Sequence, residues 1–132
     1  MHRVLTCLAS QHDYRLVLLA VLVCGVTAFT TFQIYANASG SSGFRRAAWV
    51  ALTGMSAAAG IWATHFVAML AYDPGHPANF DSILTAASLL IAAIMTTAGF
   101  ALACVRGRWQ AAGGGAVVGA GIGAMHFTGM QA

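Results

Sequence analysis

The chain is 132 residues long, and 7% of its residues are charged while 59% are hydrophobic. A water-soluble domain carries roughly 25% charged residues, so this composition excludes a soluble globular enzyme and favours a protein that crosses a membrane several times. The formal net charge of +3 comes from six scattered arginines and three aspartates, which form no basic patch and argue against nucleic-acid binding.

Four apolar stretches are each long enough to cross the hydrocarbon core of a bilayer, which takes about 20 helical residues. Since backbone polar groups inside lipid must bond to one another, we expect these stretches to be helices. They cover residues 14–36, 47–72, 82–105 and 110–132. The sequence predicts an all-α, polytopic membrane protein whose four transmembrane helices form two parallel-repeated hairpins. Residues 1–13 are expected to be a short N-terminal segment before a four-helix domain of residues 14–132.

The arginines predict which loops face the cytoplasm. The first and third expected loops carry two arginines each, whereas the middle loop carries Asp73 and Asp81 and no arginine. Cytoplasmic loops of membrane proteins are enriched in Lys and Arg. We therefore expect the first and third loops to be cytoplasmic, and the middle loop and the N-terminal segment to be extracytoplasmic.

The last expected helix is rich in glycine. Gly115, Gly119 and Gly123 recur every four residues, so they share one face of the helix. Faces made of small residues let membrane helices approach closely. This glycine face is therefore expected to pack against a neighbouring helix.

An internal repeat relates residues 60–69 to residues 121–130, with identical residues at six of the ten positions. Each copy contains a histidine followed four residues later by a methionine: His65 with Met69, and His126 with Met130. Residues four apart lie on the same helix face. The second and fourth expected helices run in the same direction, so both copies are expected at a similar depth near the outer surface.

Two parallel helices of this kind bring two imidazoles and two thioethers together. Met125 is a candidate additional donor, although it lies about 100° around the helix from His126. Imidazole and thioether donors suit copper, particularly Cu(I), better than magnesium or calcium. The sequence therefore predicts a copper site, with His12, His76 and Asp81 as candidate accessory ligands from the outer side.

Two alternatives stay open. Two histidines at one depth on two helices are also able to ligate a haem, although the close-packing glycine face argues against a wide enough gap. The second alternative is a non-catalytic helical membrane assembly module, in which both histidines form internal hydrogen bonds and no metal binds. Neither a nucleophile elbow nor a phosphate loop is present in the sequence, and we expect no enzymatic activity.

Residues 124–130, Ala-Met-His-Phe-Thr-Gly-Met, resemble the signature of the MHYT domain, a bacterial integral-membrane sensor module, and residues 62–69 resemble an earlier copy of it. The resemblance covers residues 11–132. It implies a sensor in the bacterial cytoplasmic (inner) membrane that binds copper, and through it oxygen, carbon monoxide or nitric oxide. The motif residues carried over are His65, Met69, Met125, His126 and Met130.

The resemblance also has departures. Thr64 stands where the family usually has Met, and Phe127 replaces the Tyr of the family's name. The resemblance implies three copies of the repeat, followed by a diguanylate cyclase, phosphodiesterase or kinase domain. This chain carries two copies. We therefore expect an incomplete sensor that lacks its cytoplasmic output domain, and a metal site that is incomplete or completed by a second chain in a homo-oligomer within the lipid bilayer.

Overall fold

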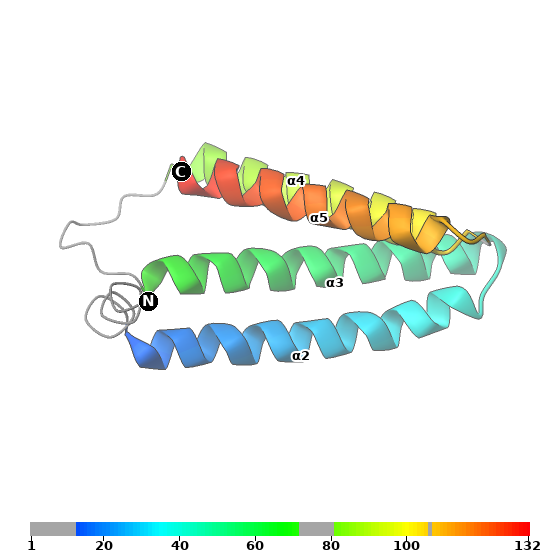
Figure 1. Ribbon diagram of the computed structural model, residues 1–132, viewed down its shortest axis with the longest axis horizontal. Coiled ribbons are helices and arrows are strands. Elements are labelled where there is room, and N and C mark those ends of the chain that lie inside the picture. The colour runs from blue at the N-terminus through cyan, green and yellow to red at the C-terminus, as the bar shows by residue number, and fades with distance from the viewer. Residues whose placement is uncertain (1–12, 72–80, 106) are drawn as a thin grey trace.

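The computed structural model describes residues 13–71, 81–105 and 107–132, and the N-terminal segment predicted for residues 1–13 lies outside this part except for its last residue. The described residues form four helices and no strand, which confirms the all-α prediction. The helices are α2 (Tyr14–Ser39), α3 (Gly43–Leu70), α4 (Ser82–Ala103) and α5 (Gln110–Met130). They run side by side along the long axis of the molecule (Figure 1).

The first two helices extend further toward each other than predicted. Helix α2 continues to Ser39 and α3 already begins at Gly43, so that Arg45 and Arg46 lie within its first turn. Arginine is a good helix former, and its long side chain reaches polar surroundings from an apolar helix. Helical structure therefore continues beyond the apolar stretch that defined the predicted boundaries.

Each hairpin begins with an aspartate that caps its first helix. Asp13 accepts a hydrogen bond from the Arg15 N–H at 2.8 Å, and Asp81 accepts hydrogen bonds from the N–H groups of Ile83 and Leu84 at 2.8 and 3.0 Å. These bonds satisfy amide groups that have no partner within the helix. The two caps fix where α2 and α4 start.

The two hairpins are closed in the same way. The backbone N–H of Asp13 donates to the carbonyl of Ala71 just after α3, and the N–H of Asp81 donates to the carbonyl of Ala132 just after α5. Ala71 and Ala132 occupy equivalent positions of the sequence repeat. The sequence duplication is therefore also a structural duplication.

Close packing within each hairpin also follows the repeat. Gly60 of α3 lies against Thr27 of α2, and its equivalent Gly121 of α5 lies against Met95 of α4, so a Cβ at either glycine would overlap its neighbour. Glycine lets membrane helices approach to backbone contact. Equivalent glycines therefore allow the helices to approach closely in both hairpins.

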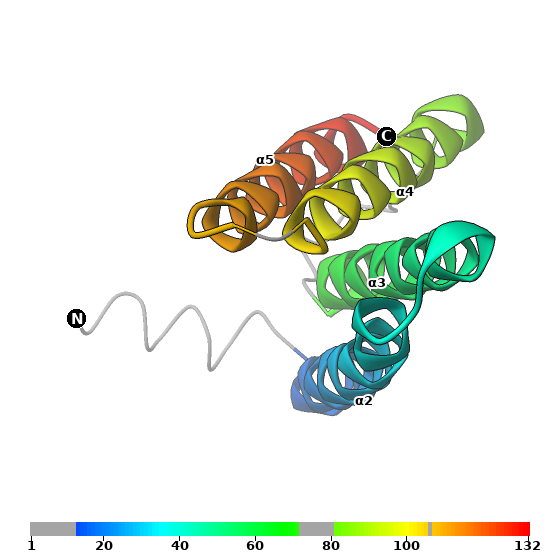
Figure 2. The ribbon, with the colours of Figure 1, turned by 90° about the vertical axis from the view of Figure 1, so that its right-hand side faces the viewer.

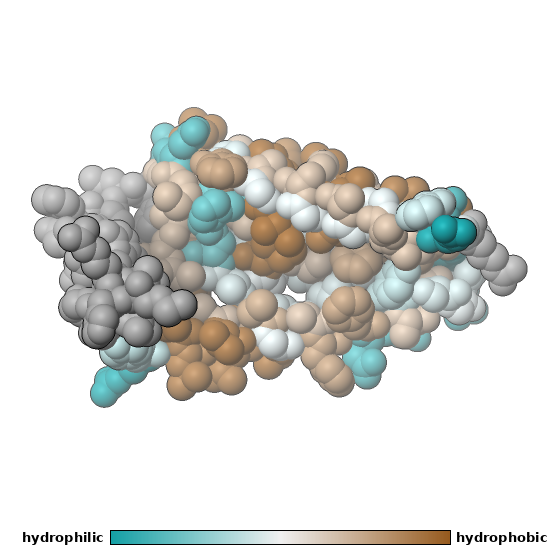
Figure 3. All heavy atoms as spheres, in the orientation of Figure 1, coloured by the Kyte–Doolittle hydropathy of each residue, from teal (hydrophilic) through white to brown (hydrophobic). Residues whose placement is uncertain are grey.

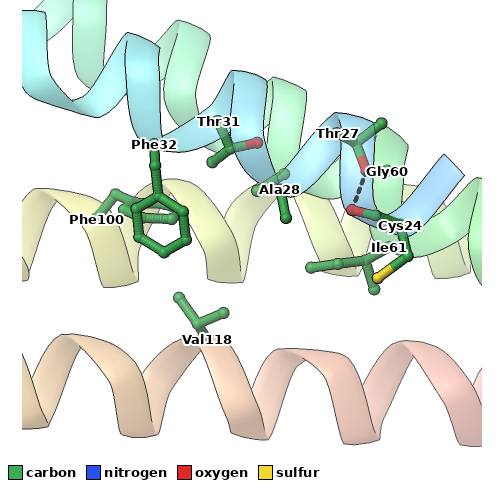
Figure 4. Close-up of a pocket in the computed structure, with 10 residues that line it drawn as sticks. Cys24, Thr27, Ala28, Thr31, Phe32, Gly60, Ile61, Phe100 and Val118 are labelled. Atoms are coloured by element: carbon green, nitrogen blue, oxygen red, sulfur yellow. Dashed lines mark hydrogen bonds between the residues drawn. The ribbon is translucent and has the colours of Figure 1, made fainter. Parts of the chain in front are cut away.

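The helices form an open arc. Extensive contacts join α2 to α3, α3 to α4, and α4 to α5, and Figure 2 shows α2 and α5 at the two ends of this arc. Between them lies a narrow apolar groove of about 150 Å³, in which Phe32, Phe100 and Val118 face one another (Figure 4). The arc leaves one side of α5 without a neighbouring helix in the described part of the chain.

The interior consists of small side chains and hydroxyl groups. Ala58, Ala92 and Met125 form the buried apolar cluster. The hydroxyl of Thr96 on α4 donates to the carbonyl of Gly54 on α3 at 2.8 Å, which links the two hairpins. Small residues and hydroxyl hydrogen bonds are typical of contacts between membrane helices.

Three of the helices, α2, α3 and α4, are long and apolar enough to cross a membrane. Large hydrophobic side chains cover much of the outer surface, and polar side chains gather mainly toward the two ends (Figure 3). We therefore treat the chain as a multi-pass membrane protein. Helix α5 is not among the helices that are apolar enough. A third of its 21 residues are glycine, which contributes little to its mean hydropathy.

Helix α5 packs through other glycines than those predicted. A Cβ on Gly115, Gly119 or Gly123 would meet no atom within 4 Å, whereas a Cβ on Gly114 would lie 2.9 Å from the Cβ of Ala103. The predicted packing face is therefore corrected. Because α4 is the main neighbour of α5, it covers a single face, which carries Gly114 and Gly121, and the predicted face points away from it.

Candidate metal centre

The four residues of the two His-x-x-x-Met pairs line one cavity. His65 and Met69 come from α3, His126 and Met130 come from α5, and Ala68 completes the lining of a cavity of about 300 Å³. The cavity lies where α3 and α5 end, at the end of the molecule that also holds the starts of α2 and α4 (Figure 1). The structure thus brings together the four donors that the sequence paired.

The two imidazole rings are in direct contact. Their Nδ1 atoms are 3.2 Å apart, the ring centroids are 4.9 Å apart, and the ring planes are inclined by 79°. This distance is that of a hydrogen bond, in which the tautomers of the two rings determine which nitrogen donates. This contact joins equivalent positions of the two repeats.

Each histidine also has an aromatic neighbour on its own helix. The ring of Phe66 lies edge-on to the ring of His65, with centroids 5.1 Å apart. The ring of Phe127 lies edge-on to the ring of His126, with centroids 5.5 Å apart. Edge-to-face packing at this distance is favourable. The histidine pair is therefore flanked by apolar rings, of which Phe66 is partly buried and Phe127 is exposed.

The two copies of the motif are not equally buried. His65 and Met69 are partly buried, whereas His126 is exposed and Met130 is 58% exposed. The α3 donors are thus more buried than the α5 donors, which lie at the surface. His65 Nε2 is buried and has no hydrogen-bond partner among the described residues.

Met125 does not line the cavity. Its side chain is 1% exposed and packs in the core with Ala58 and Ala92. The rotation of about 100° from His126 turns it toward α3 and α4 rather than toward the other donors. The structure therefore separates this candidate donor from the other four.

The candidate accessory ligands do not join the four donors in the described residues. Asp81 uses one carboxylate oxygen to cap α4, and His12 and His76 lie outside the described residues. Within the part of the chain that the structure describes, no group of three or more His, Cys, Asp or Glu side chains gathers. Any metal bound in the cavity would depend on the thioethers as well as the imidazoles.

The donor set fits a soft metal ion. Two nitrogens that each lie about 2 Å from one ion, as in tetrahedral sites, are about 3 Å apart, and the two Nδ1 atoms are 3.2 Å apart. Thioethers select Cu(I) among the common metals, and imidazole also suits copper. The cavity therefore offers a donor set of the kind that copper prefers.

The sequence pattern alone does not single out Gly129, the glycine against which His65 packs. A Cβ on Gly129 would lie 2.7 Å from His65 Nε2, so the ring fits only because this residue has no side chain. The one feature of the sequence that marks Gly129 is its position in the repeat, where its counterpart is Ala68. Which of the seven glycines of α5 performs this function depends on the rotation of the helix.

Comparison with known proteins supports the resemblance. The MHYT family model, described as "Bacterial signalling protein N terminal repeat", matches residues 59–115. The chain carries an MHYT repeat. The matched range contains His65 and Met69, and the internal repeat extends the same motif to His126 and Met130.

One relative of the chain is named as a signaling protein, and two others are named as cyclic di-GMP enzymes. The chain is 46% identical over 131 residues to an uncharacterized signaling protein of Caulobacter vibrioides, with 98% of this chain and 16% of the relative covered. It is 32% identical over 127 residues to the bifunctional diguanylate cyclase/cyclic di-GMP phosphodiesterase MucR of Pseudomonas aeruginosa, covering 95% of this chain and 18% of the relative.

A third relative is the cyclic di-GMP phosphodiesterase NbdA of Pseudomonas aeruginosa, which is 36% identical over 119 residues, with 89% of this chain and 15% of the relative covered. The chain thus spans less than a fifth of the length of these three relatives. The enzymatic names of the two Pseudomonas aeruginosa relatives describe those whole proteins, of which this chain matches a small part. No solved structure matches the chain.

Proposed function

We propose that this MHYT chain is the membrane-embedded sensory domain of a bacterial signalling protein, and that it binds copper through His65, Met69, His126 and Met130. The observation that carries the proposal is that these four side chains, separated by up to 65 positions in the sequence, line a single cavity. Ionisable and polar residues within a membrane are costly and mark function by default.

The residues of the chain would hold the ion and orient its donors. The two Nδ1 atoms would bind it as neutral imidazoles, and the thioethers would favour Cu(I) over Cu(II). Phe66 and Phe127 pack edge-on against the two histidines and would keep their orientation. Bound copper would supply a one-electron redox couple and affinity for oxygen, carbon monoxide or nitric oxide, which we propose as the sensed molecules.

We further propose that α5 is the fourth span and that the protein lies in the bacterial cytoplasmic membrane. The α2–α3 and α4–α5 loops lie at the end of the bundle opposite the cavity (Figure 1) and carry Arg45 and Arg108 near them. Positive residues favour the cytoplasmic side. The cavity would then open toward the extracytoplasmic surface, and the arginine-rich end would face the cytoplasm.

The signal would pass to a cytoplasmic output domain. Two relatives are named as cyclic di-GMP enzymes, and the chain spans less than a fifth of each of them. We propose cyclic di-GMP signalling as the process that this domain controls. In this proposal the described residues bind the sensed ligand, and the output domain carries out the enzymatic reaction.

The geometry disfavours the haem alternative. Axial nitrogens on opposite sides of one iron would lie about 4 Å apart, twice the usual metal–nitrogen distance, with the macrocycle between the rings. The two histidine rings are instead in contact, with Nδ1 atoms 3.2 Å apart. The alternative of a metal-free assembly module is decided by the experiment below.

The test is a Cu(I) titration of the purified chain in detergent, in competition with a colorimetric chelator. We expect about one Cu(I) per chain, and loss of this binding in the double variant His65→Ala/His126→Ala. Size-exclusion chromatography and the helical circular dichroism signal report whether the variant keeps its fold. Equal copper stoichiometry in both proteins would contradict the proposed site, and loss of fold without any copper binding by the wild type would favour the assembly module.

A further inference from the structure

The ring of His65 lies directly on the backbone of α5. A Cβ built on Gly129 would lie 2.7 Å from His65 Nε2 and 3.1 Å from His65 Cδ2, and real Cβ atoms essentially never approach another atom to less than 3.0 Å. Gly129 is itself buried. A residue with a side chain at this position would therefore displace the ring.

This contact determines which edge of the ring faces the cavity. The edge that carries Nε2 and Cδ2 is turned toward Gly129, and Nε2 is buried without a hydrogen-bond partner in the described part of the chain. The opposite edge carries Nδ1, which lies 3.2 Å from Nδ1 of His126. Of the two ring nitrogens of His65, Nδ1 is thus the one that faces the other donors.

The two repeats differ at this position. The counterpart of Gly129 in the first copy is Ala68, which carries the Cβ that glycine lacks and is one of the residues that line the cavity. His65, which belongs to the first copy, packs on the glycine of the second, and it is partly buried whereas His126 is exposed. The difference of one methyl group between the copies accompanies the difference in burial of the two histidines.

We propose that Gly129 is a positioning residue that selects the nitrogen through which His65 binds its ion. By admitting the Nε2 edge of the ring against α5, Gly129 leaves Nδ1 to bind copper. This inference rests on the proposed copper site and adds the identity of the coordinating atom and the residue that sets it. Neighbours that fix the orientation of a ligating histidine typically change metal affinity 10- to 100-fold when altered.

The first experiment uses the unaltered full chain in detergent micelles with ¹⁵N-labelled histidine rings. Long-range ¹H–¹⁵N spectra, assigned by single His→Gln substitutions, are recorded before and after addition of Cu(I) as its acetonitrile complex. We expect Cu(I) to shift the Nδ1 signal of His65 as a ligating nitrogen and to leave Nε2 close to its metal-free position. A ligand shift at Nε2 in place of Nδ1 would overturn the inference while leaving the copper site itself intact.

The second experiment compares Gly129→Ala with Gly123→Ala. Both variants add one methyl group to α5, but a Cβ at Gly123 meets no atom within 4 Å, which makes it a matched control. We expect Gly129→Ala to move the His65 ring signals of the metal-free protein, to abolish the Nδ1 shift and to lower Cu(I) affinity about 10-fold or more. Gly123→Ala is expected to match the wild type in all three readouts.

The outcomes separate the inference from the proposed function. Wild-type affinity and an unchanged Nδ1 shift in Gly129→Ala would overturn the positioning function of Gly129. Absence of Cu(I) binding by the wild type would overturn the proposed function and the choice of nitrogen with it, and the metal-free spectra would then decide whether Gly129 orients the ring. If Gly129→Ala fails to fold, the wild-type spectra decide: a ligand shift at Nδ1 of His65 would support the inference, and a ligand shift at Nε2 would overturn it.

Discussion

At the scale of single residues, the spacing in the sequence predicts which side chains meet but not how deeply each is buried. His65 and Met69 share a face because they are four residues apart, and the repeat predicts that His126 and Met130 join them; all four line one cavity. The burial of Met125 in the core depends on the rotation of α5, which its glycine-rich sequence leaves undetermined.

The thioether of Met130 is expected to be a copper ligand, which Met130→Leu tests because leucine keeps the apolar volume and removes the sulfur. We expect this variant to lower Cu(I) affinity about 10-fold or more, because it removes a soft donor from a soft ion and because changing even an outer neighbour of a ligand typically costs that much. Met55→Leu is the matched control, since Met55 is 56% exposed and Met130 is 58% exposed, and Met55 is not among the residues that line the cavity. Similar affinities for the two variants would show that Met130 is not a ligand.

At the scale of helices, the repeat predicts equivalent hairpins, and the structure shows them closed by equivalent hydrogen bonds from Asp13 and Asp81. The packing face of α5 was predicted incorrectly because glycine spacing alone fits two faces of the helix. Gly114 and Gly121 face α4. Gly115, Gly119 and Gly123 do not. The uncovered face carries His126 and Met130 at its outer end, which explains their exposure.

The packing of α5 predicts opposite effects for two adjacent glycines. In Gly114→Ala the added Cβ would lie 2.9 Å from both the backbone N and the Cβ of Ala103, and such overpacking costs about 1–3 kcal/mol. In Gly115→Ala the Cβ meets no atom within 4 Å, and alanine is the better helix former by up to about 1 kcal/mol.

Reversible unfolding in mixed detergent micelles, followed by circular dichroism, measures both free energies of unfolding. We expect Gly114→Ala to be less stable than the wild type and Gly115→Ala to be as stable or more stable. The reverse order would mean that α5 packs on α4 through the other face.

At the scale of the whole molecule, composition correctly predicts a helical membrane protein, because nine charged residues are too few to cover a soluble fold of this length. Composition does not predict the open arc, in which α2 and α5 enclose grooves of about 150 and 330 Å³. That arrangement follows from contacts between helices that are consecutive in the chain. It also leaves the α5 donors at the surface, where a second chain would cover them in the predicted homo-oligomer.

Membrane topology tests α5 as the fourth span. Trp109 and Gln131 flank α5, so single cysteines at these two positions, in a background without other cysteines, are expected on opposite sides of the membrane. With a membrane-impermeant maleimide, Gln131→Cys is expected to react in intact cells and Trp109→Cys only after permeabilisation. Reaction of both under the same condition would mean that α5 does not cross the membrane, and the reversed pattern would invert the proposed orientation.

X-ray absorption spectroscopy of the Cu(I)-loaded chain shows whether both repeats jointly hold one copper ion. We expect a coordination shell of two nitrogen and two sulfur scatterers, with the sulfur contribution reduced in Met69→Leu/Met130→Leu and the nitrogen contribution reduced in His65→Ala. A shell that contains no sulfur, or one that is unchanged in these variants, would contradict this expectation.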